Sequence, residues 1–391
     1  MMGRRVKITG VGMVSPAGTG VSDFRRQILE PVSRARLITR WDPAAGPFVG
    51  AEVDEFGFRK LFPHRPLKRQ SRQTAFALAA ARLALLDAGL DFAALKGRNA
   101  GLVVGTSLMD CEGMARTVMQ VMKKGPRFAL PRLIYSAGVC AATSEIADEI
   151  QAPTRSLSLQ SACCSGLDAI GHAAAEIAAG KTDIALCGGT EAPIFYHPML
   201  ELRAAGLSPL TADQPAKLGR PFDRWRTTGV IGEGACMLVL ESEDSPRPGY
   251  AWVKGYSSAS EDESNLGAGM SRAITESLAN ARTRPEEIDL INAWGPGHRI
   301  IDAVESSVLA GVFGRHLPEI PTTSIKGAIG NPLGAAGAIQ AGSVALSLRY
   351  GEVPPTVNWE FTDPECPLNL SREPRFIEAR KAIVNSHGLS G

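Results

Sequence analysis

The sequence predicts an α/β fold built from two related halves. Short strand-like runs alternate with helix-like runs along the first 245 residues. The run "DSPRPG" at 244–249 interrupts this alternation, and a strand, helix and strand follow it in the same order. The 391 residues are 44% hydrophobic and 21% charged, enough for a large core and more than one ordinary domain. We therefore expect an N-terminal half, residues 1–245, and a C-terminal half, residues 246–391.

In the first half, the β-branched and then glycine-rich run "RVKITGVGMVSPAG" predicts a buried strand that ends in a turn. The run "RQTAFALAAARLALLDAGL" has apolar residues at helical spacing and a glycine stop, which predicts a helix of about four to five turns. Further strands are expected at "NAGLVVGTS", "SLSLQSA", "DIALCGGT" and "ACMLVLES", and a helix at "SGLDAIGHAAAEIAAG".

The second half is expected to repeat the strand–helix–strand order of the first, although the two halves show no clean residue-level sequence repeat. We expect a strand at "AWVKGYSSAS", a helix at "MSRAITESLANAR" and a strand at "DLINAW". The tail "KAIVNSHGLSG" ends in a glycine-rich loop after a short strand. Because a globular chain rarely stops in such a loop, we expect residues beyond Gly391.

Composition excludes several functional classes. A formal net charge of +2 gives no global basis for binding nucleic acid or a membrane. The start "MMGRRVKITGVGMVSPAG" has no sustained apolar run after its basic residues, so we expect a soluble, cytoplasmic protein. The seven cysteines lack paired metal spacings and fit reduced thiols better than a disulfide framework. We expect no metal site and no organic cofactor.

The stretch "LQSACCSGLDAIG", residues 159–171, places two cysteines just before a predicted helix. Backbone N–H groups and the helix dipole favour a thiolate at such a place. The small neighbours Ala162, Ser165 and Gly166 allow a tight turn and are expected to leave the Cys163 sulfur accessible. A pair of buried cysteines acting as small hydrophobic residues explains the local sequence equally well.

Seven stretches, in this order, resemble the β-ketoacyl-acyl-carrier-protein synthases: "TGVGMVSPAG", "SACCSGLDAIG", "GGTEA", "GRPFDRWRTTGVIGEGACMLVLE", "INAWGPGHRIIDAVE", "IKGAIGNPLGAAGA" and "VNSHGLSG". This resemblance implies the thiolase fold, in which two related α/β halves form a five-layered αβαβα arrangement. It implies a dimer, either a homodimer or a heterodimer with another ketosynthase-like chain. It also implies that Cys163, at the cysteine of T-A-C-x-S-G, carries the acyl group, and that Cys164 is a packing residue.

The sequence departs from the family at both catalytic histidines, where Trp294 and Asn331 stand instead. An indole N–H only donates, and an amide does not titrate in this range. Since one lost acid–base group typically costs about 10²–10⁴ in rate, these changes argue against ordinary decarboxylative condensation. Acyl loading needs only a thiolate and an oxyanion hole. The resemblance places that hole at the backbone N–H groups of Cys163 and Leu389, and Lys326 matches the family's lysine.

Two of the six histidines fall inside the family motifs. His387 lies in the loop that borders the cysteine, at a family phenylalanine, and it is either a relocated base for Cys163 or a neutral residue that fills the phenylalanine's volume. His298 lies near the expected pantetheine arm, and we expect it to contact that arm rather than act as a base.

The remaining expectations concern the carrier protein and the acyl pocket. The run "HRPLKRQSRQT" contains Arg65, Lys68, Arg69 and Arg72. Such a run is usually a solvated face, but in the family this region docks the acidic acyl carrier protein. Leu108 matches a pocket-lining position, and Leu389 replaces the family's aromatic gate.

Three functions fit these residues. The first is a ketosynthase-type acyltransferase of fatty-acid or polyketide biosynthesis, loaded on Cys163 from a carrier protein or coenzyme A, with the phosphopantetheine arm as part of the substrate. The second is a non-catalytic partner like the chain-length factors, which the lost histidines favour and the retained cysteine disfavours. The third, a thiolase-like enzyme of coenzyme A thioesters, does not fit the carrier-type motifs "GRPFD" and "GAAGA".

Overall fold

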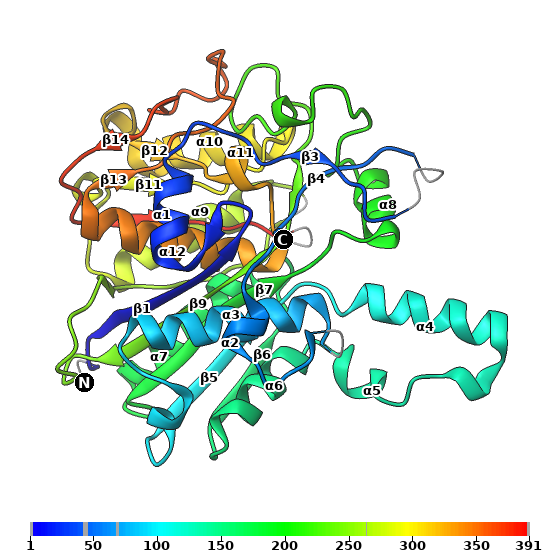
Figure 1. The fold of residues 1–391 in the computed structure, drawn as a ribbon. Coiled ribbons are helices and arrows are strands. Elements are labelled where there is room, and N and C mark those ends of the chain that lie inside the picture. Colours follow the sequence, from blue (N-terminus) through cyan, green and yellow to red (C-terminus); the bar gives the residue numbers. More distant parts are fainter. Residues whose placement is uncertain (1–2, 42–45, 68–69, 263, 389–391) are drawn as a thin grey trace.

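The larger sheet lies mainly in the first half of the chain (Figure 1). The computed structural model describes residues 3–41, 46–67, 70–262 and 264–388, and within them this sheet has seven strands in the order β10-β1-β9-β7-β5-β6, with β2 paired to β1. The strands are β1 (Val6–Ser15), β2 (Gly18–Thr19), β5 (Ala100–Gly105), β6 (Arg155–Leu159), β7 (Ile184–Glu191), β9 (Gly234–Ser242) and β10 (Ala251–Val253). β1, β5, β7 and β9 are buried along their whole length, because helices cover both faces of the sheet.

Helices α3 (Arg72–Asp87) and α6 (Ala141–Ile150) cover the outer face of this sheet, and α7 (Ser165–Ala178) and α12 (Ala336–Tyr350) cover its inner face. α3 lies directly on β1, since a Cβ at Gly12 would come within 1.9 Å of the Ala80 carbonyl oxygen. Ser71 caps this helix by accepting a hydrogen bond from the Thr74 N–H.

The second sheet has the order β12-β11-β15, with β11 (Leu290–Asn292), β12 (Thr322–Thr323) and β15 (Ala382–Val384) all parallel. It lies on α12, and α9 (Ala268–Asn280) and α10 (Arg299–Phe313) pack beyond it. The described residues therefore form five layers, αβαβα, as expected. The order β12-β11-β15 repeats the parallel order β6-β5-β7 of the first half.

The strand expected over residues 251–260 is wrong in length and in sheet. Only β10 forms, and it pairs antiparallel with β1 at the edge of the larger sheet, with Val253 opposite Val6. Residues 254–260, all of them described, have no regular structure. The other expected strands and helices are confirmed by β1, β5, β6, β7, β9, β11, α3, α7 and α9. A domain boundary at residue 245 stays a prediction.

The remaining elements extend from these layers. The strands are β3 (Arg36–Leu37), β4 (Val49–Ala51), β8 (Ile231–Gly232), β13 (Glu352–Val353) and β14 (Arg375–Phe376). The helices are α1 (Gly20–Ile28), α2 (Phe58–Leu61), α4 (Cys111–Lys124), α5 (Leu133–Ser136), α8 (Tyr196–Ala204) and α11 (Lys326–Ile329). Short 3₁₀ turns are Phe92–Leu95, Pro126–Phe128, Pro215–Lys217, Pro285–Glu287, Gly314–Glu319 and Leu333–Ala335.

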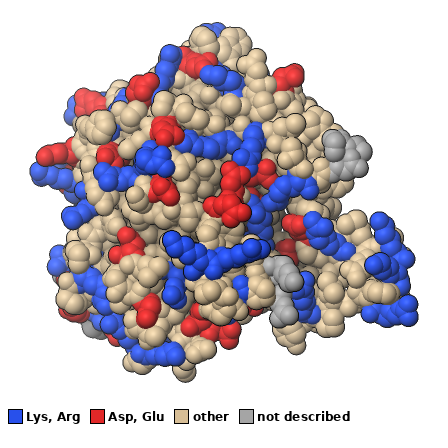
Figure 2. Space-filling model, viewed as in Figure 1, with Lys and Arg blue, Asp and Glu red and all other residues tan. Residues whose placement is uncertain are grey.

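The segment that carries α4 and α5 projects from the layered body, which the sequence did not predict (Figure 1). Its exposed side chains include Met122, Ile134 and Tyr135. Lys and Arg side chains cover its far end in Figure 2, where α4 ends with Lys123 and Lys124. None of the helices in the described ranges combines the length and the apolar character needed to cross a membrane.

At Gly105, the end of β5 packs closely against the start of α7. A Cβ there would lie 2.1 Å from the Ser165 carbonyl oxygen, so Gly105→Ala is expected to destabilise the protein by about 1–3 kcal/mol. Gly311, inside α10, is the matched control, because its Cβ would meet nothing within 4 Å; Gly311→Ala is expected to stabilise by about 0.5–1 kcal/mol. Urea unfolding measures both. Equal midpoints for the two variants would contradict this packing.

Candidate functional site

A tight turn between β6 and α7 carries the cysteine pair. Ala162 has a φ of +48°, the left-handed region that a non-glycine residue rarely adopts, so the chain turns sharply just before Cys163. The Ser165 hydroxyl holds this turn, because it accepts a hydrogen bond from the Ser161 N–H (2.9 Å) and donates to the Ala162 carbonyl (2.5 Å). Cys163 thus lies at the N-terminal end of α7, where the helix dipole favours a negative sulfur.

The expectation of an accessible sulfur is wrong, since Cys163 is only 5% exposed. Its small neighbours serve close backbone packing instead, because a Cβ at Gly166 would lie 2.7 Å from the Gly334 carbonyl oxygen. Cys163 packs in an apolar cluster with Trp294 and Leu333, and Leu108 lies against the same cluster. The expected pocket-lining residue Leu108 and Trp294, at the expected histidine position, therefore belong to or lie against the apolar cluster that contains the cysteine.

Cys164 faces a different environment. It lines a large cavity together with Asp168, and burial and the Asp168 carboxylate raise the pKa of its thiol to about 11. A thiol with that pKa is almost fully protonated near neutral pH, so Cys164 is a poor nucleophile there.

Lys326 is a buried basic residue whose charge interacts with Cys163. It is fully buried at the start of α11, where its ammonium donates to the Trp294 carbonyl and, at 3.1 Å, to Gln340 Oε1. The Nζ atom also lies 3.9 Å from the centroid of the Trp294 ring. Burial lowers the pKa of Lys326 to about 7, while negative charge on Glu305 and on Cys163 raises it. An ammonium here therefore interacts favourably with a thiolate on Cys163.

Glu305 on α10 joins the loops around this cation. Its carboxylate accepts hydrogen bonds from the backbone N–H groups of Trp294 (2.6 Å) and Gly295 (2.8 Å) and from Asn385 Nδ2 (2.6 Å). Burial raises its pKa, and these three donors and the charge of Lys326 oppose that rise. The same carboxylate thus positions the residue at the first histidine place and the loop that leads to His387.

Asn331 lies at the second histidine place. It is 8% exposed, and its backbone is held by hydrogen bonds with Val230 and Gly232. Its side-chain Oδ1 is buried and has no hydrogen-bond partner among the described residues. A buried amide with an unused polar atom is suited to binding a polar substrate group.

The two motif histidines have different surroundings. The His387 ring nitrogen Nε2 lies 3.7 Å from Glu261 Oε1, and burial lowers the pKa of His387. Its neighbour Ser386 donates a hydrogen bond to the Cys163 carbonyl (3.4 Å), so this loop does border the nucleophile. His298 caps α10 by accepting hydrogen bonds from the Ile300 and Ile301 N–H groups through Nδ1, and burial lowers its pKa.

The basic run is only partly available for docking. Arg65 is paired with Glu145, Asp148 and Glu149, and Arg72 is paired with Glu233 at 2.9 Å. These carboxylates neutralise both guanidinium groups, which the sequence did not predict. Lys68, Arg69 and Leu389 lie outside the described residues.

Comparison with known proteins identifies the family. Residues 3–245 match the family model "Beta-ketoacyl synthase, N-terminal domain", and residues 250–360 match "Beta-ketoacyl synthase, C-terminal domain". The chain belongs to the β-ketoacyl synthase family. It is 32% identical over 394 residues to the tetracenomycin polyketide synthase ketoacyl synthase alpha subunit of Streptomyces glaucescens, covering 95% of this chain and 92% of that protein.

Solved structures of β-ketoacyl synthases agree with this fold. The ishigamide ketosynthase/chain length factor matches with a TM-score of 0.91 and 33% identity. The AntDE:AntF complex, a type II PKS acyl-carrier protein with its ketosynthase bound to the hexaketide, matches with a TM-score of 0.90 and 29% identity. Each match covers 100% of this chain and 97% of the other.

Sequence reasoning missed three buried groups of this β-ketoacyl synthase site. Gln340 accepts a hydrogen bond from Lys326, and Glu305 accepts one from the Trp294 N–H. Glu191 accepts hydrogen bonds from Ser107 N (2.7 Å) and Gly334 N (3.2 Å). Burial raises the pKa of Glu191 to about 7. A signal was present for Gln340, which is a polar residue in the otherwise apolar run "GAAGAIQAG". Among the described residues, no cluster of three histidine, cysteine or acidic side chains is placed to hold a metal.

The charge on Glu305 is expected to matter chiefly through Lys326. Glu305→Gln keeps the shape but removes the negative charge that favours the Lys326 ammonium, and its amide cannot accept all three hydrogen bonds that the carboxylate accepts, so we expect a loss of about 1–3 kcal/mol in the free energy of unfolding. Lys326→Met leaves Glu305 unbalanced in the same way. The double variant is expected to be more stable than the sum of the two losses by about 1–3 kcal/mol in urea unfolding. Strict additivity would show that the two charges do not interact.

Proposed function

We propose that this β-ketoacyl synthase accepts an acyl group on Cys163 and passes it to an acceptor in polyketide or fatty-acid biosynthesis. The placement of Cys163 at the N-terminal end of α7, within electrostatic reach of the buried Lys326, is the observation that carries the proposal. Helix dipole and ammonium both favour the thiolate, which is the reactive form of cysteine.

The loading step needs a nucleophile, a base and an oxyanion hole, and we propose residues for each. The Cys163 sulfur attacks the thioester carbonyl and forms a tetrahedral oxyanion; collapse of that intermediate expels the pantetheine thiolate, which takes up the proton released by Cys163. We propose His387 as the base that moves this proton and the backbone N–H groups of Cys163 and Leu389 as the oxyanion hole. Asn331 is proposed to donate a hydrogen bond from its side-chain amide N–H to the thioester oxygen.

Decarboxylative condensation is a weaker proposal for this chain. The Trp294 ring lies against the Lys326 ammonium, so an aromatic face occupies the place where the family has an imidazole. That face stabilises the cation but transfers no proton. We therefore propose transfer of the loaded acyl group as the activity and place condensation second.

An acyl carrier protein is the proposed acyl donor, with coenzyme A as the alternative, and the phosphopantetheine arm is the part of the substrate that enters the site. The AntF carrier protein of the matched complex binds its ketosynthase, which supports this partner. We propose docking at Lys68 and Arg69, because Arg65 and Arg72 are engaged by carboxylates. His298 is proposed to contact the arm.

The second candidate is a non-catalytic subunit that pairs with an active ketosynthase. Trp294 and Asn331 favour it, and one matched structure is a ketosynthase/chain length factor. The intact cysteine turn favours catalysis. A homodimer fits the first function and a heterodimer the second.

Intact-mass analysis separates the two candidates. After incubation with acyl and malonyl thioesters of a carrier protein, the chain is expected to gain one acyl group, and Cys163→Ala is expected to gain none. Cys164→Ala is the matched control and is expected to load normally, since its thiol pKa of about 11 leaves little thiolate. Absence of any adduct, together with a stable complex with a complete ketosynthase, would establish the non-catalytic role.

A base role for His387 predicts a specific pH profile. Only the neutral imidazole takes a proton, and burial lowers the pKa of His387 from the usual 6.5. The loading rate is therefore expected to rise with pH below 6.5 and then level off, and His387→Phe is expected to lose about 10²-fold in rate together with this rise.

His298→Asn is the control for this profile, because asparagine preserves the helix cap. It is expected to keep the pH dependence while raising the apparent KM for carrier-linked substrate. If His387→Phe loads at the wild-type rate across the whole pH range, His387 is not the base.

If the carrier protein docks at Lys68 and Arg69, changing these residues is expected to affect loading from the carrier protein but not loading from a small thioester. Reversing both charges with Lys68→Glu and Arg69→Glu is expected to lower loading from the carrier protein about tenfold or more and to leave loading from a small thioester unchanged. The carrier-dependent rate is also expected to fall with rising salt. Equal loss with both substrates would place the effect in the fold rather than in docking.

A further inference from the structure

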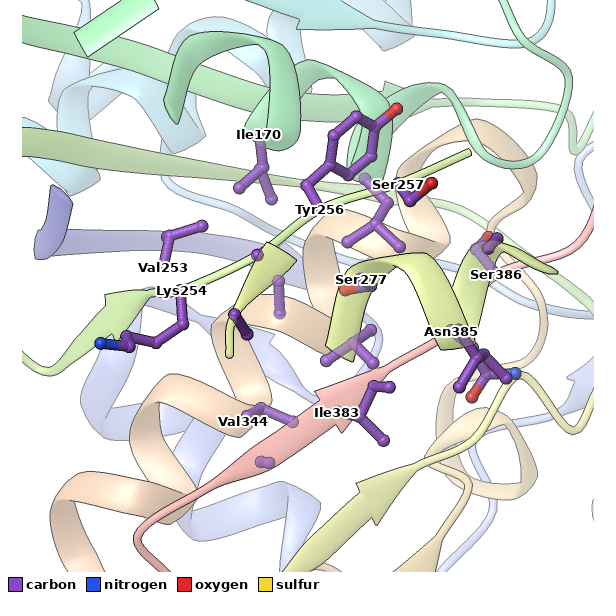
Figure 3. A pocket seen from close by; sticks show the side chains of 18 of the residues that line it. Ile170, Val253, Lys254, Tyr256, Ser257, Ser277, Val344, Ile383, Asn385 and Ser386 are labelled. Atoms are coloured by element: carbon purple, nitrogen blue, oxygen red, sulfur yellow. The ribbon is translucent and has the colours of Figure 1, made fainter. Parts of the chain in front are cut away.

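Packed apolar side chains surround Cys163. The cavity drawn in Figure 3 is lined by Cys164 and not by Cys163. Cys163 packs instead with Trp294 and Leu333, and Leu108 lies against the same cluster. An acyl chain on the Cys163 sulfur must therefore fit between these side chains. The groups that hold the side chains in place also limit the chain.

Glu191, at the end of β7, is a buried carboxylate that binds the two segments which carry these apolar side chains. Its Oε1 accepts hydrogen bonds from the Leu108 N–H (3.3 Å) and the Thr106 hydroxyl (3.2 Å). Its Oε2 accepts hydrogen bonds from the Ser107 N–H (2.7 Å), the Ser107 hydroxyl and the Gly334 N–H (3.2 Å). All of these donors are neutral, so the carboxylate joins loops here rather than neutralising a cation.

The turn at Leu333 is built around this carboxylate. Leu333 has a φ of +43°, in the left-handed region that a non-glycine residue rarely adopts, and the next N–H, of Gly334, donates to Glu191. A Cβ at Gly334 would lie 2.6 Å from Glu191 Oε2, so the glycine leaves room for the carboxylate. The position of Leu333 beside Cys163 therefore depends on Glu191.

The loop at Leu108 is held by the same carboxylate. Gln73 on α3 donates hydrogen bonds to the Thr106 hydroxyl oxygen (2.5 Å) and to the Leu108 carbonyl oxygen (3.0 Å). These two bonds use both hydrogens of the Gln73 amide and leave the Thr106 hydroxyl hydrogen for Glu191. Because the Leu108 N–H also donates to Glu191, the position of Leu108 depends on it as well.

We propose that Glu191 is a positioning residue that fixes Leu108 and Leu333 beside Cys163 and thereby selects the acyl chains that the site accepts. Glu191 acts through these two side chains and is not itself a reacting group. The inference rests on the proposed loading of Cys163, and it adds to that function the group that limits the length of the acyl chain.

Glu191→Gln tests this role because it changes one contact selectively. With its amide oxygen at the place of Oε2, glutamine still accepts from Ser107 and Gly334, but its NH₂ group then faces the Leu108 N–H. Two donors oppose each other there, so Leu108 is expected to move away from the cluster.

The readout is the ratio of the octanoyl to the acetyl loading rate constant, measured by intact mass with thioesters of N-acetylcysteamine. The assay is run at about pH 8, where the wild-type carboxylate is mostly ionised, since burial raises its pKa to about 7. Glu191→Gln is expected to raise this ratio about tenfold, because a longer chain gains most from a displaced Leu108.

Glu241→Gln is the matched control. Glu241 is also buried, lies opposite the other end of β7, and accepts hydrogen bonds from Thr9 and Arg247. It is expected to lower the Tm, as Glu191→Gln does, and to leave the loading ratio unchanged. In a Leu108→Ala background, Glu191→Gln is expected to change the ratio no further, because the side chain that it displaces is absent.

Thr106→Val is a second variant that covers failure of Glu191→Gln to fold. Valine has the shape of threonine but lacks the hydroxyl that donates to Glu191, so the ratio is expected to rise about threefold. Thr106→Ser keeps a hydroxyl and is expected to give the wild-type ratio. Equal ratios in these two variants would overturn the proposal.

Alkylation makes the test independent of acyl loading. The Cys163 thiolate displaces iodide from iodoacetamide and from its N-octyl derivative, and peptide mass mapping separates Cys163 from Cys164. If nothing loads, but Glu191→Gln raises the preference for the N-octyl reagent and Glu241→Gln does not, the proposed loading fails and the positioning role is supported. An unchanged preference for long chains in folded Glu191→Gln, or an equal change in Glu241→Gln, would overturn the positioning role.

Discussion

A buried ammonium group organises the centre of this molecule. Lys326 is buried away from solvent. Its charge is therefore stabilised by the Trp294 carbonyl and indole face, the Gln340 amide oxygen and the carboxylate of Glu305. These partners come from three places in the chain, namely Trp294 after β11, Gln340 on α12 and Glu305 on α10. Glu305 also holds the loop at Asn385. Because an unpaired charge in such a place is costly, the loops around the nucleophile are restricted to the arrangement that pairs it. The electrostatics of the site and the arrangement of the loops in the C-terminal half are therefore the same constraint.

The same constraint is compatible with the proposal that Trp294 stands in the place of a family histidine. The ring takes part in the same apolar cluster as Cys163 and presents its face to the ammonium, so the cation keeps a favourable partner. Proton transfer is what the exchange removes. We propose that such a site keeps its charge stabilisation and has reduced acid–base chemistry, which is the pattern that an acyl-loading or a partner subunit needs.

The second sheet connects this site to the rest of the C-terminal half. β15 leads directly into Asn385 and Ser386, which contact Glu305 and the backbone of Cys163. The opposite edge of β15 lines the large cavity. The loop beside the nucleophile is thus supported by a strand that is paired, among the described residues, on one side.

The sequence by itself determined the α/β class, the strands and helices of the first half, the cysteine turn and the family, because these depend on local periodicity and on ordered motifs. It also predicted one site for Cys163, Lys326 and Trp294. In the structure Cys163 and Trp294 lie in one apolar cluster and the Lys326 ammonium lies over the Trp294 ring, and their roles stay a prediction. Only the tertiary structure decided that the Cys163 sulfur is buried, that Arg65 is neutralised by α6, that residues 254–260 form no strand and that Glu305 joins the loops. These properties arise from contacts between residues far apart in the chain, and local sequence carries no record of which distant group will supply the partner.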